Sequence, residues 1–157
     1  IRCDAPSDWD PADPDPYRSH GNALHAILAR VHATGDLPKA LSLEAPNWGL
    51  TEEAQAAIAR HLQLLLARPE LEPFFGEGLH VQTESTLLDE KGRALRPDRV
   101  VREGGEIRVL DIKTGRPDDR HNHQVAEYIR LLRAVEGKPV EGWLLYIRDG
   151  SLVPVGT

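Results

Sequence analysis

Asp98, Asp111 and Lys113 are the residues whose types and spacing point most directly to chemistry. They lie in residues 96–115, which read RPDRVVREGGEIRVLDIKTG. If the two aspartates face each other on paired strands, their Cβ atoms lie about 4.5 to 5.5 Å apart. Carboxylates at that separation repel each other unless positive charge lies between them. Strand alternation puts Lys113 on the same face as Asp111, so we expect a divalent cation held by both aspartates with the ammonium beside it.

The element that must position these carboxylates is a β-hairpin. The Gly104-Gly105 pair tolerates positive φ at both central positions of a tight turn, and apolar β-branched residues flank it on both sides. Facing residue numbers in an antiparallel hairpin have a constant sum, which sets Asp98 opposite Asp111. Taken separately, a Pro-Asp turn and an Asp-x-Lys strand are ordinary structural patterns, and only their combination favours a metal site.

Periodicity and turn signals predict the other elements. Helices are predicted over residues 20–35, 51–68 and 117–137, with a loop between the first two and a short turn over residues 69–76. Further strands are predicted over residues 79–88, 142–147 and 151–155. A three-residue loop after Asp89 places Glu84 opposite Asp98, which puts a third acid at the edge of the site unless the register slips by one residue.

The predicted order is helix, helix, three meandering strands, helix, strand. The crossover helix makes strand 142–147 parallel to the strand that ends at Lys113. The sequence therefore predicts an α/β fold with a mixed sheet, an αβββαβ core and extra N-terminal helices.

Five ordered segments resemble the PD-(D/E)XK nucleases, and the RecB-like group in particular. They are SDWDP near the start, HGNALHAIL with His25, LRPDRVV with Asp98, LDIKTG with Asp111 and Lys113, and QVAEYIRLL with Gln124 and Tyr128. The αβββαβ order is that of the restriction-endonuclease-like core. The segments follow the order found in C-terminal nuclease domains of UvrD- and AddA-type superfamily 1 helicases and cover nearly the whole chain.

The resemblance implies a site and roles for its residues. The expected metal ligands are His25, Asp98, Asp111 and the carbonyl of Ile112. Mg²⁺ suits the oxygen ligands, and the imidazole would also accept Mn²⁺. Lys113 would orient the attacking water and offset transition-state charge, and the residues leave open whether it also acts as a base. Gln124 and Tyr128 would hold phosphate or water. Nearby candidates for phosphate contacts are Arg99, Arg116, Arg120, His121 and His123.

Simpler interpretations exist for the residues outside the hairpin. A histidine beside an apolar helical stripe, such as His25, is more often a core or boundary residue than a ligand. Gln124 is also compatible with a solvated helix surface, and Tyr128 with core packing between helix and sheet.

Length and charge bound the organisation of the chain. Its 157 residues fit one domain. Residues 1–16 alternate Asp with Pro and carry −4 of the formal net charge of −6, so we expect an acidic linker there and a nuclease domain over residues 17–157. Cys3 is the only cysteine, and no apolar run is long enough to span a membrane. A cytoplasmic location is therefore expected.

The resemblance implies that the substrate is DNA, as a single strand or a duplex end, in repair or recombination, and that a superfamily 1 helicase is the partner. The charge is unfavourable for independent DNA binding, and the chain begins at Ile1, so we expect it to be part of a longer polypeptide. Two alternatives remain open: a catalytically inactive nuclease fold that serves as a DNA-binding or scaffolding module, and a stand-alone restriction-type endonuclease.

Overall fold

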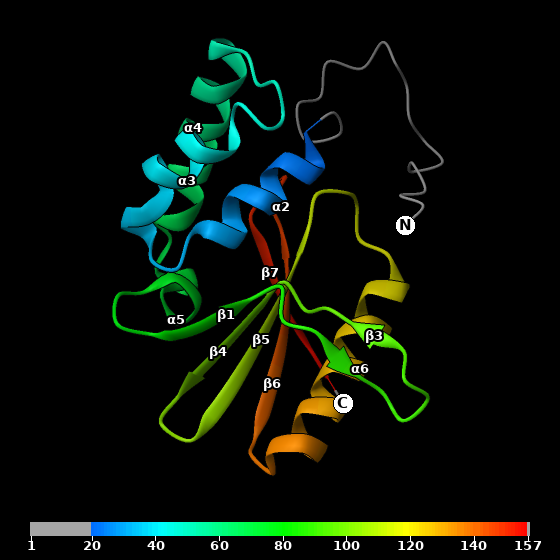
Figure 1. The fold of residues 1–157 in the computed structure, drawn as a ribbon. Coiled ribbons are helices and arrows are strands. Elements are labelled where there is room, and N and C mark those ends of the chain that lie inside the picture. Colours follow the sequence, from blue (N-terminus) through cyan, green and yellow to red (C-terminus); the bar gives the residue numbers. More distant parts are fainter. Residues whose placement is uncertain (1–19, 157) are drawn as a thin grey trace.

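A five-stranded mixed sheet forms the centre of the protein, with strand order β1-β4-β5-β6-β7 (Figure 1). The computed structural model describes residues 20–156, and the predicted linker over residues 1–16, with its SDWDP segment, lies outside the described residues. The strands are β1 (His80–Thr83), β4 (Arg99–Glu103), β5 (Glu106–Lys113), β6 (Val140–Tyr146) and β7 (Ser151–Val155).

Helices cover both faces of this sheet. One face packs against α2 (Gly21–Arg30), α3 (Leu37–Glu44), α4 (Glu52–Leu66), α5 (Glu72–Phe75) and the short 3-10 helices η1 (Thr34–Asp36) and η2 (Pro69–Leu71). The other face packs against α6 (Asp119–Glu136). Figure 1 shows α6 on the opposite side of the sheet from α2 and α4. Adjacent strand residues therefore enter different cores, and Phe74 and Phe75 of α5 are buried in the first of them.

The β4–β5 hairpin has the predicted turn and register. Gly104 and Gly105 have φ of +60° and +85°, the conformation for which glycine was expected. Glu103 pairs with Glu106, and the same register continues to the last ladder pair before the open end. The hairpin prediction is thus confirmed.

Helix α6 connects β5 to β6, and these two strands are parallel, as the crossover predicts. The Asp118 side chain accepts a hydrogen bond from the Arg120 N–H at 2.8 Å at the start of α6, and Gly137, with φ of +63°, ends the helix. Gly142 in β6 lets α6 approach closely, since a Cβ there would lie 2.5 Å from Ile129 Cδ1. The αβββαβ core and the mixed α/β class are confirmed.

Two boundaries differ from the predictions. The first helix ends at Arg30 instead of near Gly35, and the segment predicted as a loop contains α3. A proline in the first turn of α3 favours that helix. The strand predicted over residues 79–88 is broken into β1 and β2 (Leu87–Leu88), because Glu84 adopts φ of +52° and leaves the extended conformation.

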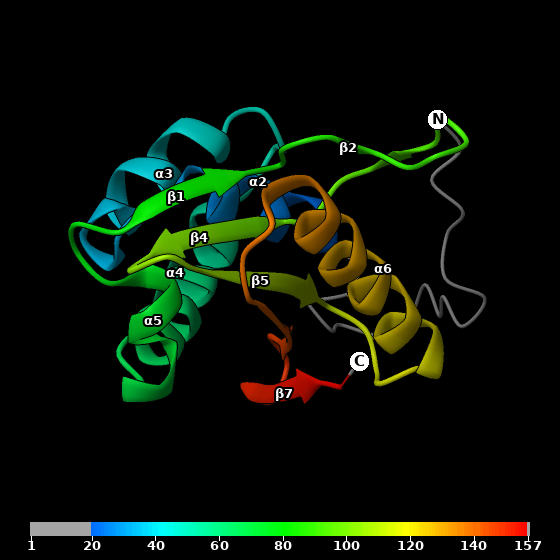
Figure 2. The ribbon, with the colours of Figure 1, turned by 90° about the horizontal axis from the view of Figure 1, so that it is seen from below.

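Strand β2 pairs with β3 (Ala94–Leu95) in a separate hairpin. It turns through three residues, since the Asp89 N–H donates to the Arg93 carbonyl at 3.0 Å. Figure 2 shows this β2–β3 hairpin projecting beyond the central sheet. None of the helices in the described part of the chain is both long and apolar enough to cross a membrane.

Candidate metal and catalytic site

The β4–β5 register brings Asp98 and Asp111 to facing positions. Arg99 pairs with Leu110, so the next facing pair is Asp98 with Asp111, at the open end of the hairpin. Asp111 lies in β5 and is 2% exposed, whereas the Asp98 side chain is 26% exposed. One carboxylate is therefore in the core, and the other lies at the boundary with solvent.

Asp98 is held against the backbone of β5. Its Oδ2 accepts a hydrogen bond from the N–H of Ile112 at 2.6 Å. Burial, and then the negative charge of Asp111, raise the pKa of Asp98 from 3.8 to about 7, against the opposing effects of His25 and the Ile112 N–H. The two carboxylates thus repel each other, as their facing positions predict.

Asp111 is only partly neutralised by the adjacent lysine. Lys113 Nζ lies 2.6 Å from Asp111 Oδ2. Within residues 20–156, however, this buried oxygen accepts no hydrogen bond of acceptable geometry. The ammonium supplies opposite charge but leaves the lone pairs of Oδ2 without a directed partner, which normally carries a penalty of about 1–3 kcal/mol.

His25 lies between two backbone carbonyls. Its Nδ1 is 2.9 Å from the Gly21 carbonyl oxygen, and its Nε2 is 2.7 Å from that of Ile112. A neutral imidazole has one N–H, so it can donate to only one of these oxygens. If Nδ1–H donates to Gly21, the lone pair of Nε2 faces the Ile112 oxygen, and a cation between them would convert that repulsion into shared coordination.

The arrangement fits a hard divalent cation. An octahedral ion with bonds of about 2.1 Å sets neighbouring ligand atoms about 3 Å apart, close to the 2.7 Å between His25 Nε2 and the Ile112 oxygen. Asp98 Oδ2 is 3.8 Å from the same Nε2. Asp111 Oδ2, which accepts no hydrogen bond within the described residues, would provide a further ligand. The donor set of oxygens with one imidazole suits Mg²⁺ or Mn²⁺.

Gln124 and Tyr128 connect Lys113 to the backbone before Asp98. Lys113 Nζ donates to Gln124 Oε1 at 2.7 Å, and Gln124 Nε2 donates to the Tyr128 hydroxyl at 2.8 Å. The Tyr128 hydroxyl in turn donates to the Arg96 carbonyl at 3.3 Å. The two helix residues share a face as their spacing predicts, and their hydrogen bonds hold the lysine in place beside Asp111.

The basic residues predicted to contact phosphate have different environments. The prediction is wrong for Arg99, which is 1% exposed and lies in the α2–α5 core. Arg120 bonds to Asp118, and His121 Nδ1 is 3.0 Å from the hydroxyl of Tyr146. Arg116 and His123 are exposed. Phosphate contacts by these last residues stay a prediction.

Glu84 lies opposite Asp98, as predicted. Its backbone N–H donates to the Asp98 carbonyl at 3.2 Å, and the β1–β4 register continues through the β2–β3 hairpin. The left-handed backbone at Glu84 sets the direction of its exposed side chain. Participation of Glu84 in metal binding stays a prediction.

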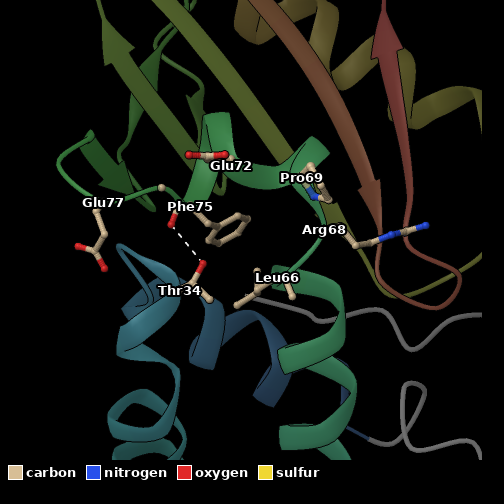
Figure 3. Close-up of a pocket in the computed structure, with 9 residues that line it drawn as sticks. Thr34, Leu66, Arg68, Pro69, Glu72, Phe75 and Glu77 are labelled. Atoms are coloured by element: carbon tan, nitrogen blue, oxygen red, sulfur yellow. Dashed lines mark hydrogen bonds between the residues drawn. The ribbon is translucent and has the colours of Figure 1, made fainter.

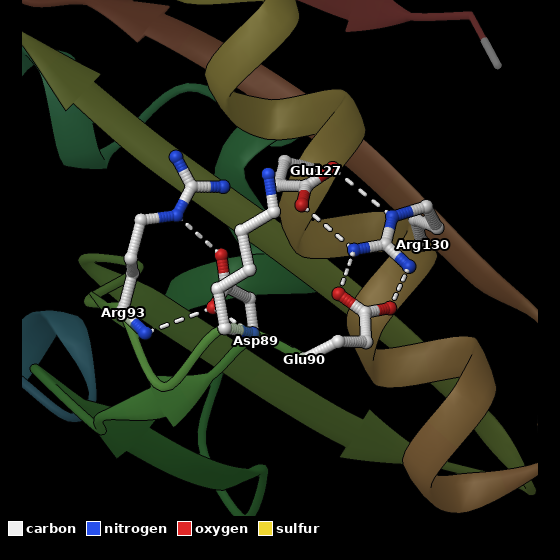
Figure 4. A network of polar contacts seen from close by, with 6 residues as sticks. Asp89, Glu90, Arg93, Glu127 and Arg130 are labelled. Carbon is white, nitrogen blue, oxygen red and sulfur yellow. Dashed lines mark hydrogen bonds and ion pairs between the residues drawn. The ribbon is translucent and has the colours of Figure 1, made fainter.

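A second acidic cluster lies on the β2–β3 hairpin and α6. Ligand atoms of Asp89, Glu90 and Glu127 lie within 4.8 Å of one another. Figure 4 shows that Arg93 and Arg130 pair with these carboxylates, with distances of 2.5 Å for Arg93–Asp89 and 2.7 Å for Arg130–Glu127. Each of these three carboxylates is paired with an arginine, whereas Asp111 Oδ2 accepts no hydrogen bond within the described residues. The Asp98–Asp111 pair is therefore the better candidate for a cation.

A pocket of about 360 Å³ lies between η1, the end of α4 and α5, and neither Asp98 nor Asp111 lines it. Thr34, Leu66 and Phe75 line it, and the Thr34 hydroxyl donates to the Phe75 carbonyl at 3.3 Å (Figure 3). None of the predicted site residues lines this pocket. The two aspartates of the predicted site lie instead at the open end of the β4–β5 hairpin.

Sequence reasoning did not identify the Arg96 carbonyl as the anchor of the Gln124–Tyr128 chain. A backbone carbonyl leaves no trace in residue identity, so no sequence signal could have found it. The link from Lys113 to Gln124 was also missed, although both residues were predicted to belong to the site.

A family model described as PD-(D/E)XK nuclease superfamily matches residues 4–154 of the chain. A search of curated protein sequences found no match to the chain. The matched range includes both aspartates, the lysine and the α6 residues that hold it, so it covers the whole of the arrangement described above.

Proposed function

The chain belongs to the PD-(D/E)XK nuclease superfamily, and we propose that it is an active, divalent-metal-dependent deoxyribonuclease that hydrolyses phosphodiester bonds. The observation that carries the proposal is the facing pair of Asp98 and Asp111 with Lys113 Nζ 2.6 Å from the buried carboxylate. A module that had lost catalysis would have no need to keep this repulsive arrangement.

Four groups would hold the cation: the carboxylates of Asp98 and Asp111, His25 Nε2 and the Ile112 carbonyl. In the tautomer whose Nδ1–H donates to the Gly21 carbonyl, 2.9 Å away, Nε2 would carry the lone pair that binds the metal. When bound, Mg²⁺ or Mn²⁺ would polarise the phosphate and favour a hydroxide nucleophile. The imidazole favours activity with Mn²⁺ as well as Mg²⁺.

Lys113 would orient the attacking water and stabilise negative charge on the phosphate in the transition state. Its ammonium already lies between Asp111 and Gln124, so little reorganisation is needed at the moment of reaction. Gln124 and Tyr128 would act on the reaction by orienting this lysine. The sequence had suggested direct contacts of these two residues with phosphate or water, and these contacts remain compatible with the exposed position of Gln124.

DNA is the proposed substrate, and a RecB-like place beside a superfamily 1 helicase is the proposed context, in repair or recombination. The formal net charge of −6 supports this context. A net negative domain attracts DNA poorly by itself, and a tethered helicase would deliver the strand to it at high effective concentration. We propose residues 1–16 as the acidic linker and residues 17–157 as the nuclease domain.

The function is tested by incubating the chain with a labelled single-stranded oligonucleotide in Mg²⁺, in Mn²⁺ and in chelator. Cleavage is expected with either metal and not with chelator. Asp111→Ala should abolish it while far-ultraviolet circular dichroism stays unchanged, and Asp119→Ala, an exposed acid at the start of α6, serves as the matched control. DNA binding without cleavage by the wild type would instead favour an inactive binding module.

A further inference from the structure

Arg99 is a fully buried cation next to a proposed metal ligand. It directly follows Asp98 in the chain and is 1% exposed. Strand alternation points it to the opposite face of the sheet, into the core formed by α2 to α5. Burial lowers the pKa of Arg99 to about 9, still above neutral pH, so the guanidinium is charged. A buried charge of this kind is costly and needs a physical reason.

The hydrogen bonds of Arg99 within the described residues go to backbone carbonyls. Its Nε donates to the Phe74 carbonyl at 2.8 Å, and one terminal nitrogen donates to the His32 carbonyl at 2.7 Å. The other lies 3.5 Å from the Leu28 carbonyl. The guanidinium also lies 4.0 Å above the centre of the Phe75 ring. One side chain therefore fastens both the end of α2 and the α5 turn to strand β4.

The position at the end of α2 suits a cation. The last carbonyls of a helix lack intrahelical donors and carry partial negative charge. Leu28 lies in the last turn of α2, and His32 follows the C-cap. The Leu28 carbonyl also accepts from the Val31 N–H at 3.1 Å, so the shorter bond of Arg99, to the His32 carbonyl, is the stronger attachment. Its planar fork reaches both carbonyls, which lysine cannot reproduce.

Helix α2 carries His25 between two attachments. At its start, a Cβ on Gly21 would lie 3.0 Å from Thr114 Oγ1, so the helix begins against the exit of β5. At its end, Arg99 joins it to β4, the strand that Asp98 precedes. The position of α2 along the sheet sets where the His25 ring lies relative to the Ile112 carbonyl and Asp98.

We propose that Arg99 is a positioning residue for the metal site: by fixing the end of α2 to β4, it holds His25 Nε2 within ligand distance of the Asp98 and Ile112 oxygens. This inference rests on the proposed function. It assigns to Arg99 a role in metal affinity that is exerted through His25, and not through contact with metal or DNA.

The test is a double-mutant cycle on Mn²⁺ affinity, measured by calorimetry with wild type, Arg99→Lys, His25→Ala and the double variant. Lysine keeps the charge but cannot join three carbonyls. Arg99→Lys should weaken Mn²⁺ binding on the order of tenfold, the lower end for supporting residues around metal sites. In the His25→Ala background the same change should have no further effect, because the ligand it positions is gone.

Arg102→Lys is the matched control, since Arg102 lies on the same strand but pairs with Glu136; its Mn²⁺ affinity should equal that of the wild type. A wild-type affinity for Arg99→Lys, or an equal loss in both backgrounds, overturns the positioning role. If the wild type binds no Mn²⁺, the proposed function itself fails, and the role of Arg99 fails with it.

A second measurement needs no change at Arg99. The side-chain Nε–H signal of Arg99 is followed by NMR during Mg²⁺ titration to saturation. The signal should shift in the wild type, because metal binding to His25 displaces α2 slightly and so changes the hydrogen bonds between the end of α2 and Arg99. In His25→Ala the shift should be strongly reduced. An unchanged signal in the saturated wild type, or an equal shift in both proteins, overturns the inference even if Arg99→Lys does not fold.

Discussion

Replacing Asp98 with Asn should stabilise the metal-free protein, and the gain should grow with pH. The pKa of Asp98 is raised from 3.8 to about 7 by burial and by the charge of Asp111. The folded state therefore binds this proton more tightly than the unfolded state does. Linkage then makes the wild type lose stability as pH rises from about 4 to about 7, and the full loss is present above that window.

The magnitude follows from the width of the window. Each pH unit in which only the folded state holds the proton lowers the free energy of unfolding by about 1.4 kcal/mol. Between pH 5 and pH 8 the wild type should therefore lose up to about 3 kcal/mol relative to Asp98→Asn. The value is an upper one because the side chain is 26% exposed, and solvent screens part of the repulsion. Asn keeps an oxygen that can accept from the Ile112 N–H, so the hydrogen bond at 2.6 Å is preserved.

The assay is urea unfolding of the wild type and Asp98→Asn in chelator at pH 5 and pH 8. At each pH the free energy of unfolding of the wild type is subtracted from that of the variant, so that the titration of groups common to both proteins cancels. Asp118→Asn is the matched control. The hydrogen bonds from Arg120 lower the pKa of Asp118, so this carboxylate is ionised in both states at either pH, and Asn can still cap α6. Its difference from the wild type should not change between the two pH values.

A constant difference between Asp98→Asn and the wild type at pH 5 and pH 8 would refute the reasoning, because it would mean that neither burial nor Asp111 raises the pKa of Asp98 in the folded protein. Lower stability of Asp98→Asn at pH 8 in chelator would do the same. With saturating Mg²⁺ the order should reverse, because the wild type then gains the free energy of metal binding that the variant lacks.

Three further predictions concern the chemistry and the substrate. Lys113→Ala should lower the cleavage rate by a factor on the order of 10² or more while calorimetry shows Mn²⁺ affinity equal to the wild type or higher; a collapse of affinity would make the lysine structural. His25→Ala should do the reverse, with weaker metal binding and a cleavage rate that recovers at high Mn²⁺ in a metal titration. Fluorescence anisotropy with a single-stranded oligonucleotide in Ca²⁺ should show weak binding by the isolated domain. The logarithm of the binding constant should fall with the logarithm of the salt concentration by about 0.7 for each phosphate contact, and only a few contacts are expected. Tight binding at physiological salt would point to an independent nuclease.

The hairpin and its carboxylates could be predicted because the signals are local. Gly104-Gly105 defines the turn, and a constant sum then sets every facing pair up to Asp98 and Asp111. The starts of helices α4 and α6 are equally local, because Thr51 accepts a hydrogen bond from the Ala54 N–H and Asp118 accepts one from the Arg120 N–H. Where one short segment determines its own geometry, the sequence pattern predicts the structure correctly.

The failures at α3 and Arg99 are cases in which distant contacts decide the outcome. Helix α3 was predicted as a loop because its eight residues carry a weak periodic signal, and packing against α2 and α4 stabilises it. Arg99 was expected at a phosphate because positive charge near Asp98 suggests DNA. Nothing in the sequence distinguishes that arginine from one that bonds to carbonyls 67 and 25 residues away.

Three groups at the open end of the hairpin are each imperfectly satisfied by the protein alone. Asp98 has a raised pKa, Asp111 Oδ2 lacks a directed partner, and the His25 ring faces two carbonyl oxygens. A single divalent cation would relieve all three at once. It would offset the carboxylate repulsion, take Asp111 Oδ2 as a ligand and coordinate both His25 Nε2 and the Ile112 carbonyl. Groups that are unfavourable separately but compatible with one ligand indicate binding, because folding alone would not select them together. The same argument makes the cluster of Asp89, Glu90 and Glu127 the weaker candidate, because each of its carboxylates already has an arginine partner.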